Sequence, residues 1–410
     1  MKNIVLFLLF YISTISCNNT ESGKIEVLTL GTIHSQHIKS HYGYNDVIDA
    51  LATFNPDLIC VEIRPEDFRK EYYLVEMMLA TTYGDVHNIP VVPIDYWDAN
   101  NNNRLIRDSL GKIDKYIRLL RIADSLETNN VLLKNFKNKF EANGDNIYRN
   151  YDLGIDFWNG KEYNDYVRES YKISISIFGD SPFNLNYISR NSKMLTNIKL
   201  GIKKYNAKKV IVLTGAEHKS IFDDSLKMDK SILVTSLTDI EPLNHSDFGE
   251  LLKRFRPCQY FTKADSLTTE KFYTTLIMPY VHGPDMDFYI SNIDLRNLPL
   301  VYIILKNWES DAPNSLNLVY DWAWYYFLKK DYDTSIKYCN QYILKKDYHD
   351  LVFDRGTAYR MLGFCYDLKN QRQKAIEYYK KAREEFILSK KPDWQIKALL
   401  EDYESKPYSR

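Results

Sequence analysis

The sequence predicts an α/β protein: a mostly parallel sheet with pseudo-repeated halves and a helical insertion, followed by an α-helical repeat tail. Two observations predict it. Short apolar segments alternate with segments of helical spacing through residues 25–240, which is the pattern of strand–helix–strand units. Residues 311–410 then carry a helical pattern that repeats after about 40 residues.

The first half of the expected α/β domain, which spans residues 25–240, contains three strands. We expect them at residues 24–30, 58–61 and 91–94, with helical spacing of apolar residues in 45–53 and 77–83. Strands that alternate with helices in this way form parallel sheets. Their near-continuous apolar character is typical of a sheet that is covered on both faces.

A helical insertion separates the two halves. Residues 100–103 form a polar break, and residues 104–171 have the pattern of helices rich in charge and tyrosine. We expect this insertion to lie as a cap over the sheet. A further helix begins near residue 189, and strands at 210–213 and 232–234 complete the domain.

Residues 241–310 connect the α/β domain to the tail. Prolines at positions 257, 279, 284 and 299 interrupt any long helix there. The pattern leaves open whether the region adds strands or packs as a linker.

The tail resembles tetratricopeptide repeats. One unit matches well and a second, degenerate unit precedes it; the matching residues of the first are Tyr359, Leu362, Gly363, Tyr366, Ala375, Tyr379 and Ala382, and those of the second are Trp322, Ala323, Tyr326, Ser335 and Tyr342. Two units are fewer than the three that such arrays need for stability. We therefore expect the tail to lean on the preceding domain, and its concave face to bind a partner protein.

The N-terminus has the pattern of an export signal. After Lys2, residues 4–15 form an apolar run that is too short to span a bilayer. Ser16 and Cys17 end this run and resemble a bacterial lipobox, which predicts a signal peptide over residues 1–16, a linker over 17–24 and a lipid on Cys17. Such a lipid would anchor the protein to a membrane of the bacterial cell envelope, facing the periplasm or the cell surface. A plain secretory signal is the alternative.

Four further cysteines stand at positions 60, 258, 339 and 365, without a CxxC motif. In an oxidising compartment they could pair. Cys60 lies in an apolar run and Cys365 in a helical pattern, so we favour small buried hydrophobic residues.

The charge and the absent motifs exclude several functions. Lys and Arg number 54, as do Asp and Glu, and this zero net charge argues against nucleic-acid partners. The sequence has no glycine-rich phosphate loop, no GxSxG nucleophile elbow and no HExxH zinc motif. Nucleotide-driven, serine esterase and zincin chemistries are therefore disfavoured.

Four polar residues follow apolar strands directly: His34, Glu62, Asp95 and His218. Ligands of open parallel sheets bind at the carboxyl ends of the strands, so these side chains converge if their strands are neighbours. His34 and His218 each end a Gly-x-x-His sequence after a strand. This repetition favours a functional pair, whereas a single histidine there is more often structural.

The residue types allow two kinds of site. Two imidazoles and a carboxylate, His34, His218 and Glu62, can hold a divalent metal such as Mn, Co or Zn. Alternatively, Glu62 oriented by a histidine acts as a general base on water.

Four further residues are candidates for contact with a substrate. Arg190 and Asn191 could hold an anionic or carbonyl group, or only cap a helix. Asp95 and Arg64 are further candidates; Asp95 could merely cap the next segment, and Arg64 could form a structural pair with Glu62. His37 and His41 share a helical face with His34, which makes a three-histidine metal site conceivable, although a solvated face is the simpler interpretation.

These residues together resemble the TraB/PrgY–TIKI superfamily, which includes erythromycin esterases and the haem-binding ChaN proteins. The resemblance rests on the motifs around His34, Glu62, Arg190 and His218 and covers about residues 25–240. It implies an α/β core of two related halves. It also implies His34 and Glu62 as the central pair, supported by His218 and Arg190. The long insertion matches no single member, which leaves the substrate class open.

Two functional hypotheses follow. In the first, the protein is a hydrolase that activates water through the His/Glu site, with or without a metal, on a peptide or ester, and Arg190 stabilises the developing oxyanion. In the second, the domain binds a ligand such as haem or a peptide without catalysis, and the tail binds a partner protein.

Overall fold

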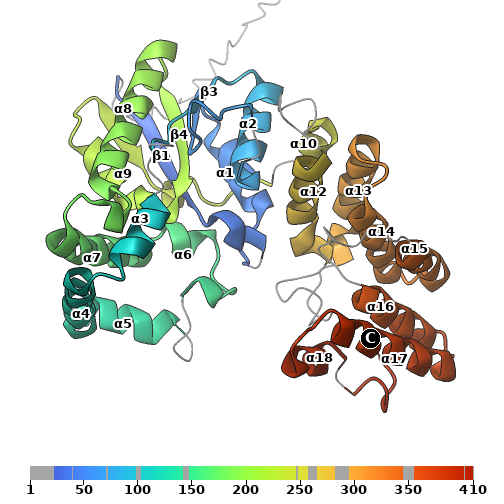
Figure 1. Ribbon diagram of the computed structural model, residues 1–410. Coiled ribbons are helices and arrows are strands. Elements are labelled where there is room, and N and C mark those ends of the chain that lie inside the picture. Colours follow the sequence, from blue (N-terminus) through green and yellow to red (C-terminus); the bar gives the residue numbers. More distant parts are fainter. Residues whose placement is uncertain are drawn as a thin grey trace, which may run out of the picture.

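The computed structural model describes residues 23–38, 40–70, 73–97, 103–141, 147–245, 248–256, 266–281, 295–344, 355–400 and 402–409. The proposed signal peptide, Cys17 and Cys258 lie outside these residues. Figure 1 shows an α/β part at the N-terminal side and a helical part at the C-terminal side. The predicted fold class is confirmed.

A five-stranded, all-parallel sheet forms the centre of the α/β part. Its strands are β1 (Ile25–Thr32), β2 (Leu58–Val61), β3 (Val91–Pro93), β4 (Lys209–Gly215) and β5 (Ile232–Thr235). Their order in the sheet is β3-β2-β4-β1-β5. The registers pair Val61 with Leu213 and Thr32 with Gly215. The ends of β1 and β4 are therefore level, and β2 ends two residues earlier at the same edge of the sheet.

Alternate residues of each strand enter two separate cores, as expected for a sheet covered on both faces. On one face, Leu28 and Ile211 pack with α1 (Tyr44–Phe54) and α2 (Val75–His87). On the other, Val27 and Val212 pack with α8 (Tyr187–Tyr205) and α9 (Ala216–Lys227). The sheet is thus the middle of three layers.

The insertion is helical, as predicted, and extends somewhat past residue 171. Its helices are α3 (Asn103–Leu110), α4 (Asp114–Asn129), α5 (Val131–Phe140), α6 (Ile155–Asn159) and α7 (Lys161–Phe178). In Figure 1, α4, α5 and α7 lie together below the sheet. Asn159 of α6 fastens this unit to the sheet, because its side chain accepts the Gly31 N–H at 2.7 Å and donates to the Gly31 carbonyl at 3.1 Å.

The connecting region adds helices, not strands, within its described residues. These are α10 (Phe248–Arg254), α12 (Ser266–Val281) and α13 (Leu298–Asp311). Pro279 lies near the end of α12 and Pro299 lies in the first turn of α13. A proline in the first turn costs no helical hydrogen bond. These two prolines therefore stand near helix ends without preventing helices.

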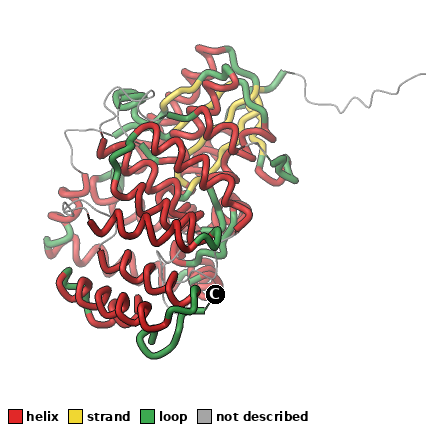
Figure 2. The backbone as a smooth tube through the Cα atoms, turned by 90° about the vertical axis from the view of Figure 1, so that its right-hand side faces the viewer, coloured by secondary structure: helices red, strands yellow, loops and turns green. Residues whose placement is uncertain are grey.

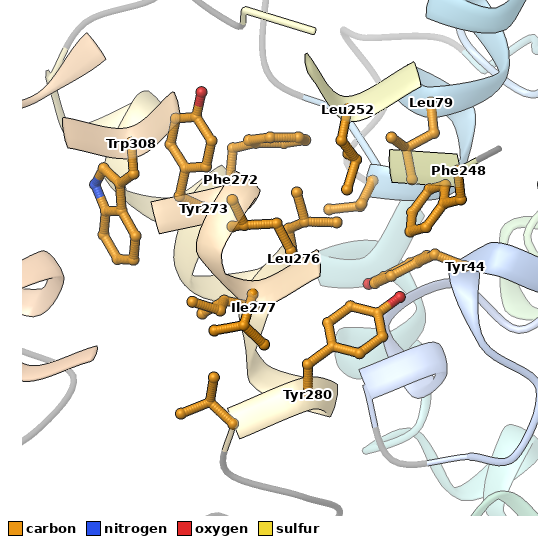
Figure 3. Close-up of a cluster of buried hydrophobic side chains, with 14 of the residues drawn as sticks. Tyr44, Leu79, Phe248, Leu252, Phe272, Tyr273, Leu276, Ile277, Tyr280 and Trp308 are labelled. Atoms are coloured by element: carbon orange, nitrogen blue, oxygen red, sulfur yellow. The ribbon is translucent and has the colours of Figure 1, made fainter. Parts of the chain in front are cut away.

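Helices α10 and α12 join the α/β part to the tail through one continuous apolar core. Figure 3 shows Tyr44 of α1 and Leu79 of α2 beside Phe248 and Leu276, with Trp308 of α13 on the far side of α12. Asn307 of α13 also donates a hydrogen bond of 2.6 Å to the Leu252 carbonyl.

The tail consists of paired helices: α14 (Leu316–Leu328) with α15 (Tyr332–Leu344), and α16 (Arg355–Leu368) with α17 (Arg372–Leu388), followed by α18 (Asp393–Leu400). Figure 2 shows these helices stacked away from the strands. The small residues lie where helices of a pair approach closely. A Cβ on Gly363 would come within 2.2 Å of the Tyr379 ring, and the Ser335 hydroxyl donates to the Ala323 carbonyl at 2.9 Å.

Cys60, Cys339 and Cys365 are buried free thiols, as predicted. None of the helices that the structure describes is both long and apolar enough to cross a membrane.

Candidate functional site

The four polar residues predicted at strand ends lie at the same edge of the sheet. His34 follows β1, Glu62 follows β2, Asp95 follows β3 and His218 lies in the first turn of α9, directly after β4. Arg190 reaches them from α8 and joins them: it donates to Glu62 at 2.7 Å and to Asp95 at 2.9 Å, and its Nη1 lies 3.2 Å from Nε2 of His218.

A cavity of about 630 Å³ opens at this edge. His34, Glu62, Arg190 and His218 line it, and so does Tyr148 of the insertion. A substrate in this cavity would therefore contact groups from both the sheet and the insertion.

The Glu62 carboxylate is fully engaged in hydrogen bonds. Oε1 accepts from Arg190, while Oε2 accepts from the Thr214 hydroxyl at 2.7 Å and from the Gly215 N–H at 2.6 Å. Burial alone would raise the pKa of Glu62, but the neighbouring imidazoles, the guanidinium and the Gly215 N–H hold it well below its usual range. A carboxylate so stabilised is a weak base. Glu62 is therefore better suited to hold cations in place than to abstract a proton.

His218 is neutral and oriented. Its Nδ1 lies 2.7 Å from Oδ1 of Asn191, whose amide N–H₂ donates to the Tyr187 carbonyl at 2.7 Å. The Asn191 oxygen can only accept, so Nδ1 carries the proton and Nε2 keeps its lone pair. Burial lowers the pKa of His218 to about 4, against the opposing charge of Glu62.

His34 is held in the opposite charge state. Burial favours the neutral ring, but the hydrogen bond to Glu76, at 2.9 Å, and the charges of Glu62 and Glu76 raise the pKa of His34 to about 9. His34 has a φ of 52°, a left-handed conformation that is uncommon for residues other than glycine. This conformation lies at the turn between β1 and the short 3-10 helix His34–Ile38.

The glycines of the two Gly-x-x-His sequences provide space. A Cβ on Gly31 would lie 2.9 Å from the Cα of Ala216, and a Cβ on Gly215 would lie 2.7 Å from Nε2 of His34. Both distances are shorter than Cβ contacts in proteins allow. Neither glycine has a positive φ, so the close approach of neighbouring atoms, and not backbone conformation, requires glycine at these positions.

Three residues that were candidates for substrate binding contact protein groups. Asn191 orients His218, and Asp95, which is 4 % exposed, accepts from Arg190. Arg64 pairs with Asp67 at 2.5 Å and lies over the Trp97 ring, so it forms no pair with Glu62. None of the three is among the residues that line the cavity.

The other two histidines do not extend the site. His37 is fully buried; its Nε2 accepts the Ile33 N–H at 3.3 Å and its Nδ1 donates to the Tyr42 carbonyl at 2.7 Å. We expected a solvated face for His37, and the structure buries it because both ring nitrogens have backbone partners. His41 is exposed beside Asp152.

Sequence reasoning assigned no role to two carboxylates. Glu76 is a buried charge in the otherwise apolar start of α2, and a charge inside an apolar helical run was the available signal. Glu217 lines the cavity beside His218 and accepts hydrogen bonds from Tyr148 at 2.8 Å and Tyr171 at 2.6 Å. Both tyrosines come from the insertion, so nothing local in the sequence indicated this contact.

The donor set at the cavity does not fit a divalent metal in this arrangement. The Arg190 guanidinium occupies the space between Glu62 and His218. It directs an N–H at Oε1 of Glu62 and another at Nε2 of His218, the atoms that would otherwise ligate a metal. Within the described residues, no group of three or more His, Cys, Asp or Glu side chains could hold a metal ion. Metal binding by His34, Glu62 and His218 stays a prediction of the sequence.

No protein-family model, curated protein or solved structure matches the chain.

Proposed function

We propose that this protein is a hydrolase that activates water at the cavity edged by His34, Glu62, Arg190 and His218, without a metal ion. The observation that carries the proposal is the placement of two imidazoles in opposite environments beside one guanidinium, at the wall of an open cavity. Pairs of titratable groups held in opposite protonation states are how enzymes provide an acid and a base at one pH.

In this proposal His218 is the general base. Its Nε2 lone pair accepts a proton from water, and the Asn191 oxygen keeps Nδ1 protonated. A substrate carbonyl that accepts the Arg190 N–H would free Nε2 for that water. This role replaces the one that we expected for Glu62, whose pKa lies below that of His218 and whose carboxylate already accepts three hydrogen bonds.

Arg190 and His34 are the electrophilic groups. The water oxygen bonds to the carbonyl carbon, and the carbonyl electrons move to its oxygen, where Arg190 and the protonated His34 stabilise the negative charge. When the tetrahedral intermediate collapses, His218 returns its proton to the leaving amine or alcohol. The negative charge of Glu62 stabilises both cations, Arg190 and His34, throughout.

The experiment is hydrolysis of a panel of p-nitrophenyl esters and peptide p-nitroanilides by the purified chain. A general base contributes about 10²- to 10⁴-fold to the rate, so His218→Ala is expected to reduce kcat/KM by that factor. EDTA should leave the rate unchanged. Equal rates for His218→Ala and wild type would overturn the proposal. Activity that EDTA removes, and that Mn, Co or Zn restores, would instead establish the predicted metal site.

Membership in the TraB/PrgY–TIKI superfamily remains part of this proposal. It is supported by the matching placement of His34 and His218 after two adjacent parallel strands, whose registers pair Gly31 with Thr214 and Thr32 with Gly215. The haem-binding alternative has a direct test, which is a Soret band after haem is added to the purified chain.

A further inference from the structure

Glu217 lies between two cavities. It lines the cavity of the proposed reaction site and also a second cavity of about 630 Å³ inside the insertion. Tyr148 lines both cavities as well. A ligand in the second cavity would therefore contact Glu217, which directly precedes His218 in the sequence.

The Glu217 carboxylate has no cationic partner among the described residues. Its two oxygens accept from the hydroxyls of Tyr148 and Tyr171, both neutral groups. The nearest cations of the reaction site, His34 and Arg190, are already matched by three carboxylates, namely Glu62, Glu76 and Asp95. They leave no net positive charge to neutralise Glu217.

The wall of the second cavity also carries carboxylates that no cation in the described part of the chain neutralises. Lys137, which lines it, pairs with Glu127 at 3.4 Å, and Arg107 lies 3.8 Å from its own neighbour Asp108. Glu217 and Glu141 therefore remain as carboxylates without an ion pair on the described part of the wall.

Aromatic rings form much of the rest of this wall, and packing holds them in place. Tyr171 stacks on Tyr187 with ring centroids 3.6 Å apart, and Tyr166 stacks on Phe136 at 4.1 Å. Tyrosine rings around an uncompensated carboxylate are the surroundings that attract ammonium groups, through the ring faces as well as through the charge.

We propose that the cavity between Glu217 and the tyrosines of α7 binds a protonated or quaternary amine carried by the substrate. This inference rests on the proposed hydrolase, because it names the class of substrate for that site: an ester or amide with a cationic amine near the bond that breaks. Glu217 holds the ammonium group, and the carbonyl then lies toward His218 and Arg190.

The test uses choline and its uncharged isostere 3,3-dimethyl-1-butanol, with binding to the purified full chain measured by calorimetry. We expect saturable binding of choline at millimolar concentrations. The neutral alcohol should bind at least about tenfold more weakly, because it lacks the charge that Glu217 attracts; a tenfold difference corresponds to about 1.4 kcal/mol of binding free energy. Equal binding of the two probes, or no binding of choline, would overturn the proposal. Binding of N-acetylglucosamine without choline would assign the cavity to neutral sugars and overturn it too.

Variants separate the charge from the shape of the cavity. Glu217→Gln removes the charge at nearly constant volume and should weaken choline binding at least tenfold. Tyr171→Phe keeps the ring and the charge and should bind choline at least as well as wild type. The matched control is Glu162→Gln, on the same insertion but at an exposed carboxylate paired with Lys139; it should change nothing. A loss of choline binding in Tyr171→Phe or Glu162→Gln would contradict a role for the Glu217 charge.

The two proposals can fail separately. His218→Ala should reduce hydrolysis by about 10²- to 10⁴-fold and keep choline binding, because His218 does not line the second cavity. A chain that binds choline in the Glu217-dependent manner but hydrolyses no substrate would retain the amine site and contradict only the hydrolase. A chain that hydrolyses neutral esters but does not bind choline would retain the hydrolase and contradict only the amine site.

Discussion

The two histidines at the cavity have the same side chain and are predicted to carry different charges at neutral pH. The difference comes from the partner of each Nδ1: a carboxylate, Glu76, for His34 and an amide oxygen, Asn191, for His218. A carboxylate stabilises the imidazolium, whereas a buried amide oxygen only fixes the tautomer of the neutral ring. Single substitutions at these partners should therefore change one histidine at a time.

Replacing Glu76 by Gln should lower the pKa of His34 from about 9 toward 6.5, because the hydrogen-bonded carboxylate is lost. NMR titration of the ring carbons measures this directly. Glu62 and Arg190 also face His34 and are unchanged in the variant. A wild-type His34 that titrates near pH 6.5 would contradict the assignment.

The raised pKa of His34 also makes the free energy of unfolding depend on pH. A folded-state pKa above the unfolded value means that His34 stabilises the fold fully below about pH 6.5, and that this contribution is lost as the pH rises through about 9. Urea unfolding of wild type should show this decline between those pH values, and Glu76→Gln should show less of it. A parallel decline in both proteins would assign it to other groups.

Replacing Asn191 by Ala should release the tautomer of His218, because nothing else in the described contacts accepts the Nδ1 proton. The nitrogen chemical shifts of the ring should change from one tautomer to a mixture, and ester hydrolysis should fall by about tenfold or more. Unchanged shifts with lower activity would indicate a structural effect only.

At the scale of elements, β1 and α9 meet with no room for a side chain. A Cβ on Gly31 would lie 2.9 Å from the backbone of Ala216, so Gly31→Ala must push the strand and the helix apart. Overpacking of this kind costs about 1–3 kcal/mol. Gly154→Ala is the control, since no atom lies within 4 Å of the added Cβ. Urea unfolding measures both, and equal losses would show that contact is not the cause.

At the scale of the whole molecule, the shared core predicts that the α/β part and the tail unfold together. Leu276 of α12 is 1 % exposed within this core, and Leu276→Ala should cost about 2–5 kcal/mol. In urea, the unfolding transitions detected by far-UV circular dichroism and by tryptophan fluorescence should coincide. The fluorescence signal includes Trp158 of the insertion and Trp308 of α13. Leu267→Ala, at a 66 % exposed position of the same helix, should change stability by less than about 0.5 kcal/mol. Two separate transitions would contradict one cooperative unit.

Membrane attachment is a separate prediction at this scale, and it rests on the sequence alone. Cells that express the full chain and are fed a labelled fatty acid should incorporate label at Cys17, and Cys17→Ala should lose both the label and the membrane fraction. An unlabelled, secreted wild type would favour the plain export signal.

The sequence by itself determined the order of strands and helices, the buried thiols, and the positions of His34, Glu62, Asp95 and His218 at strand ends. These features are local: apolar periodicity defines each strand, and a parallel sheet brings the carboxyl ends of its strands to one edge. Only the tertiary structure decided what those residues contact. Glu76, Asn191 and Glu217 acquire their partners from helices that the sequence places up to 69 positions away, and hydrogen bonds at that range leave no periodic pattern. The charge of each histidine, and with it the proposed chemistry, depends on those distant partners because burial makes every neighbouring charge count.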